Sequence, residues 1–90
     1  MSVQDVLSEM KKISAVARMA SGFPGLGALA MEADALDALI ANPGTVEKIY
    51  AGVEGGLTFA QSAVAFFREN GLGNLAHWLT TWGPSPTLSE

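Results

Sequence analysis

The chain has 90 residues, of which 49% are hydrophobic and 16% charged, and its formal net charge is -4 at pH 7. Five lysines and arginines against nine acids exclude a basic nucleic-acid-binding surface, because such a surface needs clustered cations to displace phosphate counterions. No cysteine is present, which excludes a disulfide framework and a thiolate metal site.

The first predicted element is a helix over residues 2–20. Ser2 and Asp5 have the spacing of a capping box, in which each side chain accepts a hydrogen bond from the other residue's backbone N–H. Apolar side chains then recur at steps of three and four residues, at Val3, Val6, Leu7, Met10, Ile13 and Val16. Glycine and proline within residues 21–25 end this helix.

The second predicted helix covers residues 26–41. Its expected inner stripe is Leu29, Ala33, Leu36 and Ile40. Asn42, Pro43 and Gly44 are expected to stop it, and Thr45 is the expected N-cap of the next helix. We expect the second and third helices to form an antiparallel hairpin.

The third segment, residues 45–70, permits two interpretations. A three/four step of apolar residues crosses Gly55 and Gly56 and predicts one continuous helix, with its stripe at Val46, Ile49, Tyr50, Val53, Leu57, Ala60, Val64 and Phe67. Three glycines, at 52, 55 and 56, cost about 3 kcal/mol relative to alanine in a helix, which favours a break at 55–56. Thr58 and Gln61 are suited to cap a helix that starts anew.

A short helix is predicted over residues 74–82, with Leu75, Trp78, Leu79 and Trp82 on one side. No segment has the alternation of a strand. The predicted fold is therefore all-α, a small bundle of three to five helices in a single domain at 1–83, followed by a flexible tail at 84–90.

Export and membrane insertion are not expected. Asp5 and Glu9 stand where a signal peptide would carry a basic region and an apolar run. Two of the longest apolar runs without charge, 19–31 and 55–67, have 13 residues each, and about 20 are needed to span a bilayer. The expected location is cytoplasmic.

Candidate sites for chemistry are few, and each has a simpler structural explanation. Residues 25–30 fit the G-x-G-x-x-A pattern of dinucleotide-binding loops, but that pattern needs a preceding strand, and a helix is predicted there. Glu32, Asp34 and Asp37 share one helix and fit an acidic contact surface, a metal site or an ordinary solvated face. His77 is the only histidine, and no nucleophile elbow or phosphate loop occurs. We therefore expect no enzyme activity, no cofactor and no bound metal.

Tyr50 and Glu54 have the Tyr-x-x-x-Glu spacing of type VII secretion substrates, which are small helical hairpins of similar length, and the chain resembles them in this respect. It departs from that family in two ways. The family's Trp-x-Gly turn is missing at residues 42–44, and its Tyr motif follows the hairpin, whereas Tyr50 falls within a predicted helix. No family is assigned on these two residues.

The main functional prediction rests on the amount of apolar side-chain surface in the chain. With 49% hydrophobic residues and a mean hydropathy of +0.28, a chain of this length has more apolar side chain than its own core can cover. We therefore expect a protein that self-associates or caps a protein partner, a profile common in phage and mobile-element accessory proteins and in small structural subunits. The predicted contact residues are Gly52, Gly55, Gly56, Phe59, Phe66, Phe67, Trp78 and Trp82.

Two alternatives remain open. A stripe of tryptophans and long uncharged stretches suit a protein that rests on a membrane surface. A small-ligand pocket at an oligomer interface would draw its polar groups from Glu32, Asp37, Tyr50 and His77.

Overall fold

Five α-helices make up the fold. The structure is a computed structural model that describes the backbone of residues 1–82 and the side chains of residues 1–81. The helices are α1 (Val3–Ala20), α2 (Ala28–Ile40), α3 (Pro43–Glu54), α4 (Phe59–Glu69) and α5 (Gly73–Trp82). No strand occurs within residues 1–82, so the predicted all-α class is confirmed. The tail predicted at 84–90 lies outside the described residues.

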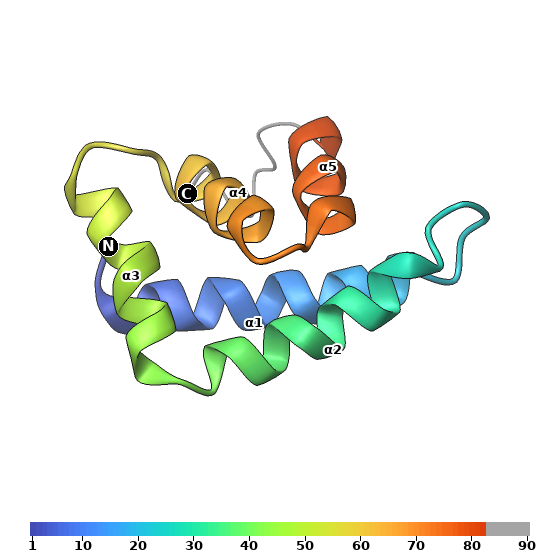
Figure 1. The fold of residues 1–90 in the computed structure, drawn as a ribbon, viewed down its shortest axis with the longest axis horizontal. Coiled ribbons are helices and arrows are strands. Elements are labelled where there is room, and N and C mark those ends of the chain that lie inside the picture. Colours follow the sequence, from blue (N-terminus) through green and yellow to red (C-terminus); the bar gives the residue numbers. More distant parts are fainter. Residues whose placement is uncertain (83–90) are drawn as a thin grey trace.

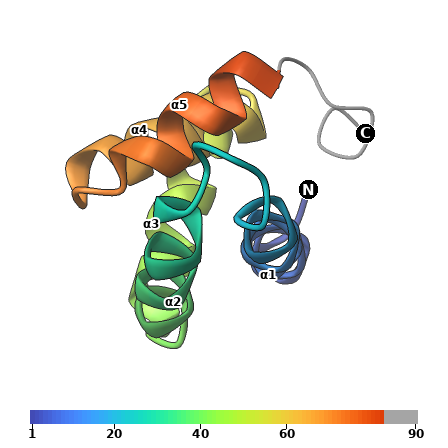
Figure 2. The same ribbon diagram turned by 90° about the vertical axis from the view of Figure 1, so that its right-hand side faces the viewer.

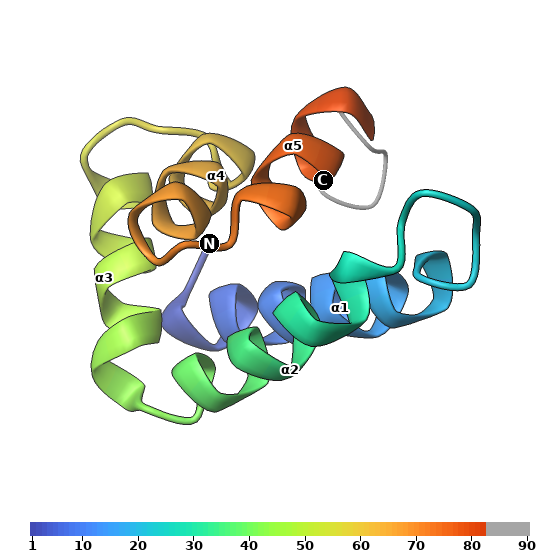
Figure 3. The ribbon, with the colours of Figure 1, turned by 45° about the vertical axis from the view of Figure 1, so that its right-hand side comes forward.

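The helices form two layers. α1 and α2 lie side by side and run antiparallel along one edge of the molecule (Figures 1 and 3). α3 leaves the end of α2 and leads across to α4, and α4 and α5 pack against each other over the first layer (Figure 2). The principal partner of α2 is therefore α1, and the predicted hairpin of the second and third helices is not the main pairing.

The start of α1 is the predicted capping box. Asp5 N donates to Ser2 Oγ at 3.1 Å, and Ser2 N donates to Asp5 Oδ2 at 2.8 Å. These hydrogen bonds, with the Ser2 backbone N–H as the larger contributor, lower the pKa of Asp5. The face that α1 buries consists of Val6, Met10, Ile13, Ser14 and Ala17.

The predicted stripe of α2 is confirmed, because Leu29, Ala33, Leu36 and Ile40 are all buried. The predicted N-cap of the next helix at Thr45 is wrong by three residues. Asn42 is the N-cap, with its Oδ1 accepting from Gly44 N at 2.9 Å, and Pro43 occupies the first helical position. Proline suits that position because its missing N–H would have no intrahelical acceptor there.

The third predicted segment is broken, as the second interpretation had it. Gly55 caps α3, and Gly56 has a φ of 111°, a left-handed conformation that side chains disfavour. Thr58 and Gln61 form the capping box of α4, at 3.1 Å for Gln61 N to Thr58 Oγ1 and 2.9 Å for Thr58 N to Gln61 Oε1.

The break shifts the helical phase, so the stripe predicted beyond it is only partly right. α4 buries Phe59, Ser62, Ala63, Phe66 and Phe67, whereas Leu57 is exposed and Ala60 and Val64 are only half-buried. α5 completes the core with Leu75, Ala76 and Leu79. No helix of the described part of the chain is long and apolar enough to cross a membrane.

Candidate functional site

An open groove lies between α4 and α5 and has a volume of about 610 Å³. It begins at the residue before the Thr58 cap and follows one side of α4 to its last turn, with α5 as the other wall. Its lining residues are Leu57, Ala60, Gln61, Val64, Ala65, Arg68, Leu79 and Thr80. Most of them are apolar, so the groove suits apolar side chains of a ligand.

The groove exists because α4 is apolar on two sides. One side holds the buried phenylalanines, and the adjacent side carries Ala60 and Val64, which the chain leaves half-buried. Leu57, in the loop just before α4, is 43% exposed and extends the second side. A helix that buries a single stripe normally places polar residues elsewhere, so this second apolar side is surplus to the core.

Small residues shape the groove. Ala60 and Ala65 keep the α4 wall low, and Leu79, which is buried, forms part of the opposite side. Thr80 Oγ1 donates to Ala76 O at 2.7 Å within α5, which satisfies its hydroxyl hydrogen. A helix backbone is therefore able to approach α4 closely here.

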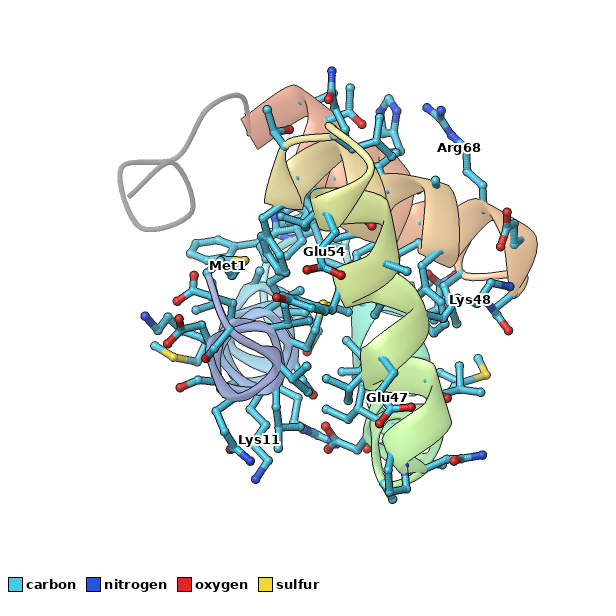
Figure 4. All side chains as sticks on the ribbon, turned by 90° about the vertical axis from the view of Figure 1, so that its left-hand side faces the viewer. Met1, Lys11, Glu47, Lys48, Glu54 and Arg68 are labelled. Carbon is cyan, nitrogen blue, oxygen red and sulfur yellow. The ribbon has the colours of Figure 1, made fainter. Side chains whose placement is uncertain are left out.

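Arg68 is the charged residue of this groove. Figure 4 shows its side chain extending away from the helical body on the side of the molecule opposite Lys11. No acidic side chain within residues 1–81 forms an ion pair with it, whereas neighbouring Glu69 pairs with Lys48 at 3.1 Å. The guanidinium is thus available to a carboxylate from outside.

The three phenylalanines predicted as contact residues lie in the core. Phe67 has no exposed surface, Phe59 and Phe66 are buried, and the rings of Phe66 and Phe67 pack with centroids 6.0 Å apart. Trp78 is half-buried against the same core. The Trp82 side chain lies outside the described residues. The contact surface proposed below is therefore built from other side chains.

Gly52 provides a close helix approach within the chain. A Cβ at this position would lie 2.4 Å from Ser62 Oγ, so glycine lets α3 and α4 meet. Ser62 Oγ donates to Ile49 O at 2.8 Å across the same contact. Gly55 and Gly56 end α3 and turn the chain toward α4. Contact of these glycines with a partner stays a prediction.

Two of the three carboxylates predicted as a possible acidic surface pair with one arginine. Arg18 Nη2 lies 2.5 Å from Asp34 Oδ1 and 2.6 Å from Asp37 Oδ2, and Arg18 Nη1 donates to buried Ser14 Oγ at 2.9 Å. Partial burial raises the pKa of Asp37, but Ser14 and Arg18 together lower it by more, so the net pKa is below its usual value. This pairing links α1 to α2.

The third carboxylate, Glu32, caps α5 from α2. Its Oε1 accepts from Leu75 N at 2.8 Å, and its Oε2 accepts from Asn74 Nδ2 at 2.7 Å and from Asn74 N at 3.3 Å. A carboxylate is favoured at a helix N-terminus by the free N–H groups and the helix dipole. Glu32 therefore holds the α5 wall of the groove in place.

The remaining predicted polar residues have separate surroundings. Glu54 raises the pKa of the Tyr50 hydroxyl through a hydrogen bond, and His77 is exposed on α5. In the glycine-rich stretch 25–30, residues 25–27 end the loop after α1 and residues 28–30 begin α2, with no strand before them in the described chain. Among residues 1–81, no group of three or more His, Asp or Glu side chains is placed to hold a metal ion.

Two further surface features were not found from the sequence. A second groove, of about 600 Å³, lies between α1 and α2 beside Lys11, Arg18 and Asp37. Phe23, in the loop between these helices, is 66% exposed, and Met19 and Met31 on either side of the loop are also exposed. The exposed apolar residues around Phe23 fall within residues 19–31, a stretch that has no charged residues in the sequence and could have indicated this apolar surface.

Comparison of the chain with protein-family models, curated proteins and solved structures gives no match. Any function is therefore argued from this chain's own surfaces.

Proposed function

We propose that the chain is a small cytoplasmic helical protein that acts through protein–protein contact, by self-association or by capping a partner, and that the α4–α5 groove is its contact site. The single observation that supports this is the second apolar side of α4, which the chain's own core leaves open between Leu57 and Arg68. Covering that surface releases water from apolar side chains and stabilises the complex.

The groove favours a macromolecular occupant over a small ligand. It is open along its length, and among residues 1–81 its lining contains only one charged side chain, Arg68, to orient a compact polar molecule. A helix laid lengthwise makes contacts at successive turns and needs no enclosed cavity. The exposed apolar residues near Phe23 add a further surface for assembly.

Light scattering after size exclusion, from about 1 to about 200 µM protein, tests the self-association arm because small interfaces have dissociation constants in this range. If the chain self-associates through the groove, the wild-type mass rises with concentration and the Ala65→Glu variant stays monomeric. Ala65 is exposed and lines the groove, so this change adds charge without disturbing the core. Ala38→Glu, at an exposed position of α2 outside the groove, is the matched control.

A wild-type protein that stays monomeric contradicts self-association. If it also binds no apolar dye, capping of a partner is contradicted as well, and the proposal fails.

A further inference from the structure

We infer that the occupant of the α4–α5 groove is an amphipathic helix from another protein that carries an acidic side chain beside its apolar stripe. This inference rests on the proposed function and goes beyond it by stating the partner's chemistry. It follows from the shape of the groove and from the charge at its end.

Shape identifies the form of the occupant. The α4 wall presents Ala60, Val64 and Arg68 at helical spacing, over about 12 Å at 1.5 Å per residue. A hollow of this length accommodates two to three turns of a ridge that repeats with the same period, with anchors at i, i+3 or i+4, and i+7. A second copy of this groove is also hollow, so two copies facing each other would leave a gap between them. A convex helix fills the hollow.

The charge of Arg68 at the end of the groove indicates which kind of residue the occupant carries there. The lining is apolar at Leu57 and ends at Arg68, whose guanidinium has no acidic partner within residues 1–81. An acidic residue on the incoming helix, about two turns from its first apolar anchor, would lie beside Arg68. A basic residue there would be repelled. The groove therefore favours a helix with carboxylates at one end of its stripe.

The test uses a displayed library of helical peptides about 14 residues long, which is somewhat longer than the groove. The apolar positions i, i+3, i+4 and i+7 are kept as Leu or Ala, and the flanking positions vary freely. Selection is run against the wild-type chain, and enriched peptides are measured by fluorescence anisotropy at low salt. We expect them to carry Asp or Glu at one end, and exchange of that acid for Lys to weaken binding about fivefold.

Two variant pairs locate the binding. Arg68→Glu should reverse the preference from acid to lysine, while Lys11→Glu makes the same charge change on the opposite side of the molecule and should leave it intact (Figure 4). Ala65→Glu should abolish binding, because it fills the groove and gives Arg68 a carboxylate one turn away in its own helix. Ala38→Glu should bind as the wild type does. The acid preference should shrink in high salt, since exposed charges are screened.

Enriched peptides with no acidic preference, or with a preference that Arg68→Glu leaves unchanged, would overturn the inference while the proposed function survives. So would binding that Ala65→Glu retains. Failure to enrich any peptide, with a wild-type chain that nevertheless self-associates, would assign the groove to a second copy and overturn the inference alone. A chain that enriches no peptide, stays monomeric and binds no dye overturns both.

Discussion

The contact between Gly52 and Ser62 predicts that alanine at position 52 destabilises the fold, although alanine normally favours helices. An added Cβ would lie 2.4 Å from Ser62 Oγ and 3.2 Å from Ser62 Cβ, and both distances are shorter than real Cβ contacts usually are. Rotating the hydroxyl away does not relieve the contact freely, because Oγ donates to Ile49 O at 2.8 Å in a buried site.

The magnitude follows from two opposing terms. Overpacking a close helix contact costs about 1–3 kcal/mol, and replacing glycine by alanine in a helix gains about 1 kcal/mol. The difference between these terms is a loss of up to about 2 kcal/mol, so we expect Gly52→Ala to lower the free energy of unfolding by an amount within that range. In a Ser62→Ala background the hydroxyl is gone and only the 3.2 Å contact with Cβ remains, so the same substitution should be close to neutral.

Urea denaturation followed by circular dichroism measures all four proteins of this double-mutant cycle. Gly44→Ala is the control, because a Cβ there meets Asn42 Oδ1 at an ordinary 3.4 Å and should not destabilise by overpacking. A Gly52→Ala protein that is more stable than the wild type, or as destabilised with Ser62→Ala as without it, would refute the proposed α3–α4 contact.

Three further substitutions test other parts of the structure. Glu32→Gln removes the charge that caps α5, and we expect unfolding at lower urea, by about 1 kcal/mol in the free energy of unfolding; an unchanged midpoint would show that α5 does not depend on this cap. Gly56→Ala places a side chain at a φ of 111°, and we expect a loss of about 1–2 kcal/mol in the same assay, against which an unchanged stability would count. For Asp37 the folded-state pKa is lowered, so its stabilising contribution is present above the unfolded pKa of about 3.9 and is lost as the pH falls through the folded pKa. Urea midpoints of Asp37→Asn should accordingly fall less between about pH 5 and pH 2 than those of the wild type, and parallel curves would contradict the pairing with Arg18.

Local signals in the sequence predicted most of the fold. The Ser2 and Thr58 capping boxes and the α2 stripe depend on residues within one or two turns, and the structure has them as predicted. The prediction of Thr45 as the N-cap was wrong because Asn42 and Pro43 both follow the end of α2 and begin α3. From the sequence pattern alone, these residues indicate only the end of a helix.

The groove was harder to predict because its position depends on helical phase. Leu57, Ala60 and Val64 continue the stripe of α3, and they would face the core if the helix ran straight through Gly56. The turn at Gly56 rotates α4, so the phenylalanines take the core and the other residues line the groove. A periodicity argument cannot assign the rotation across a break.

Long-range pairings left no signal in the sequence. Glu32 and Leu75 are 43 positions apart, and nothing local marks Glu32 as the cap of α5. Arg18 binds Asp34 and Asp37 only because α1 and α2 are antiparallel neighbours. Exposed apolar residues lie at Phe23 and in the groove, whereas Phe59, Phe66 and Phe67, which were predicted as contact residues, are buried.

Binding of an apolar fluorescent dye to the monomer, compared between the wild type and Ala65→Glu, measures the open α4–α5 groove most directly. The wild type should enhance the dye's fluorescence, Ala65→Glu should lose most of that enhancement, and Ala38→Glu should retain it, because only Ala65 lines the groove. Equal fluorescence from all three proteins, or none from the wild type, would contradict an exposed apolar groove and with it the contact function argued here.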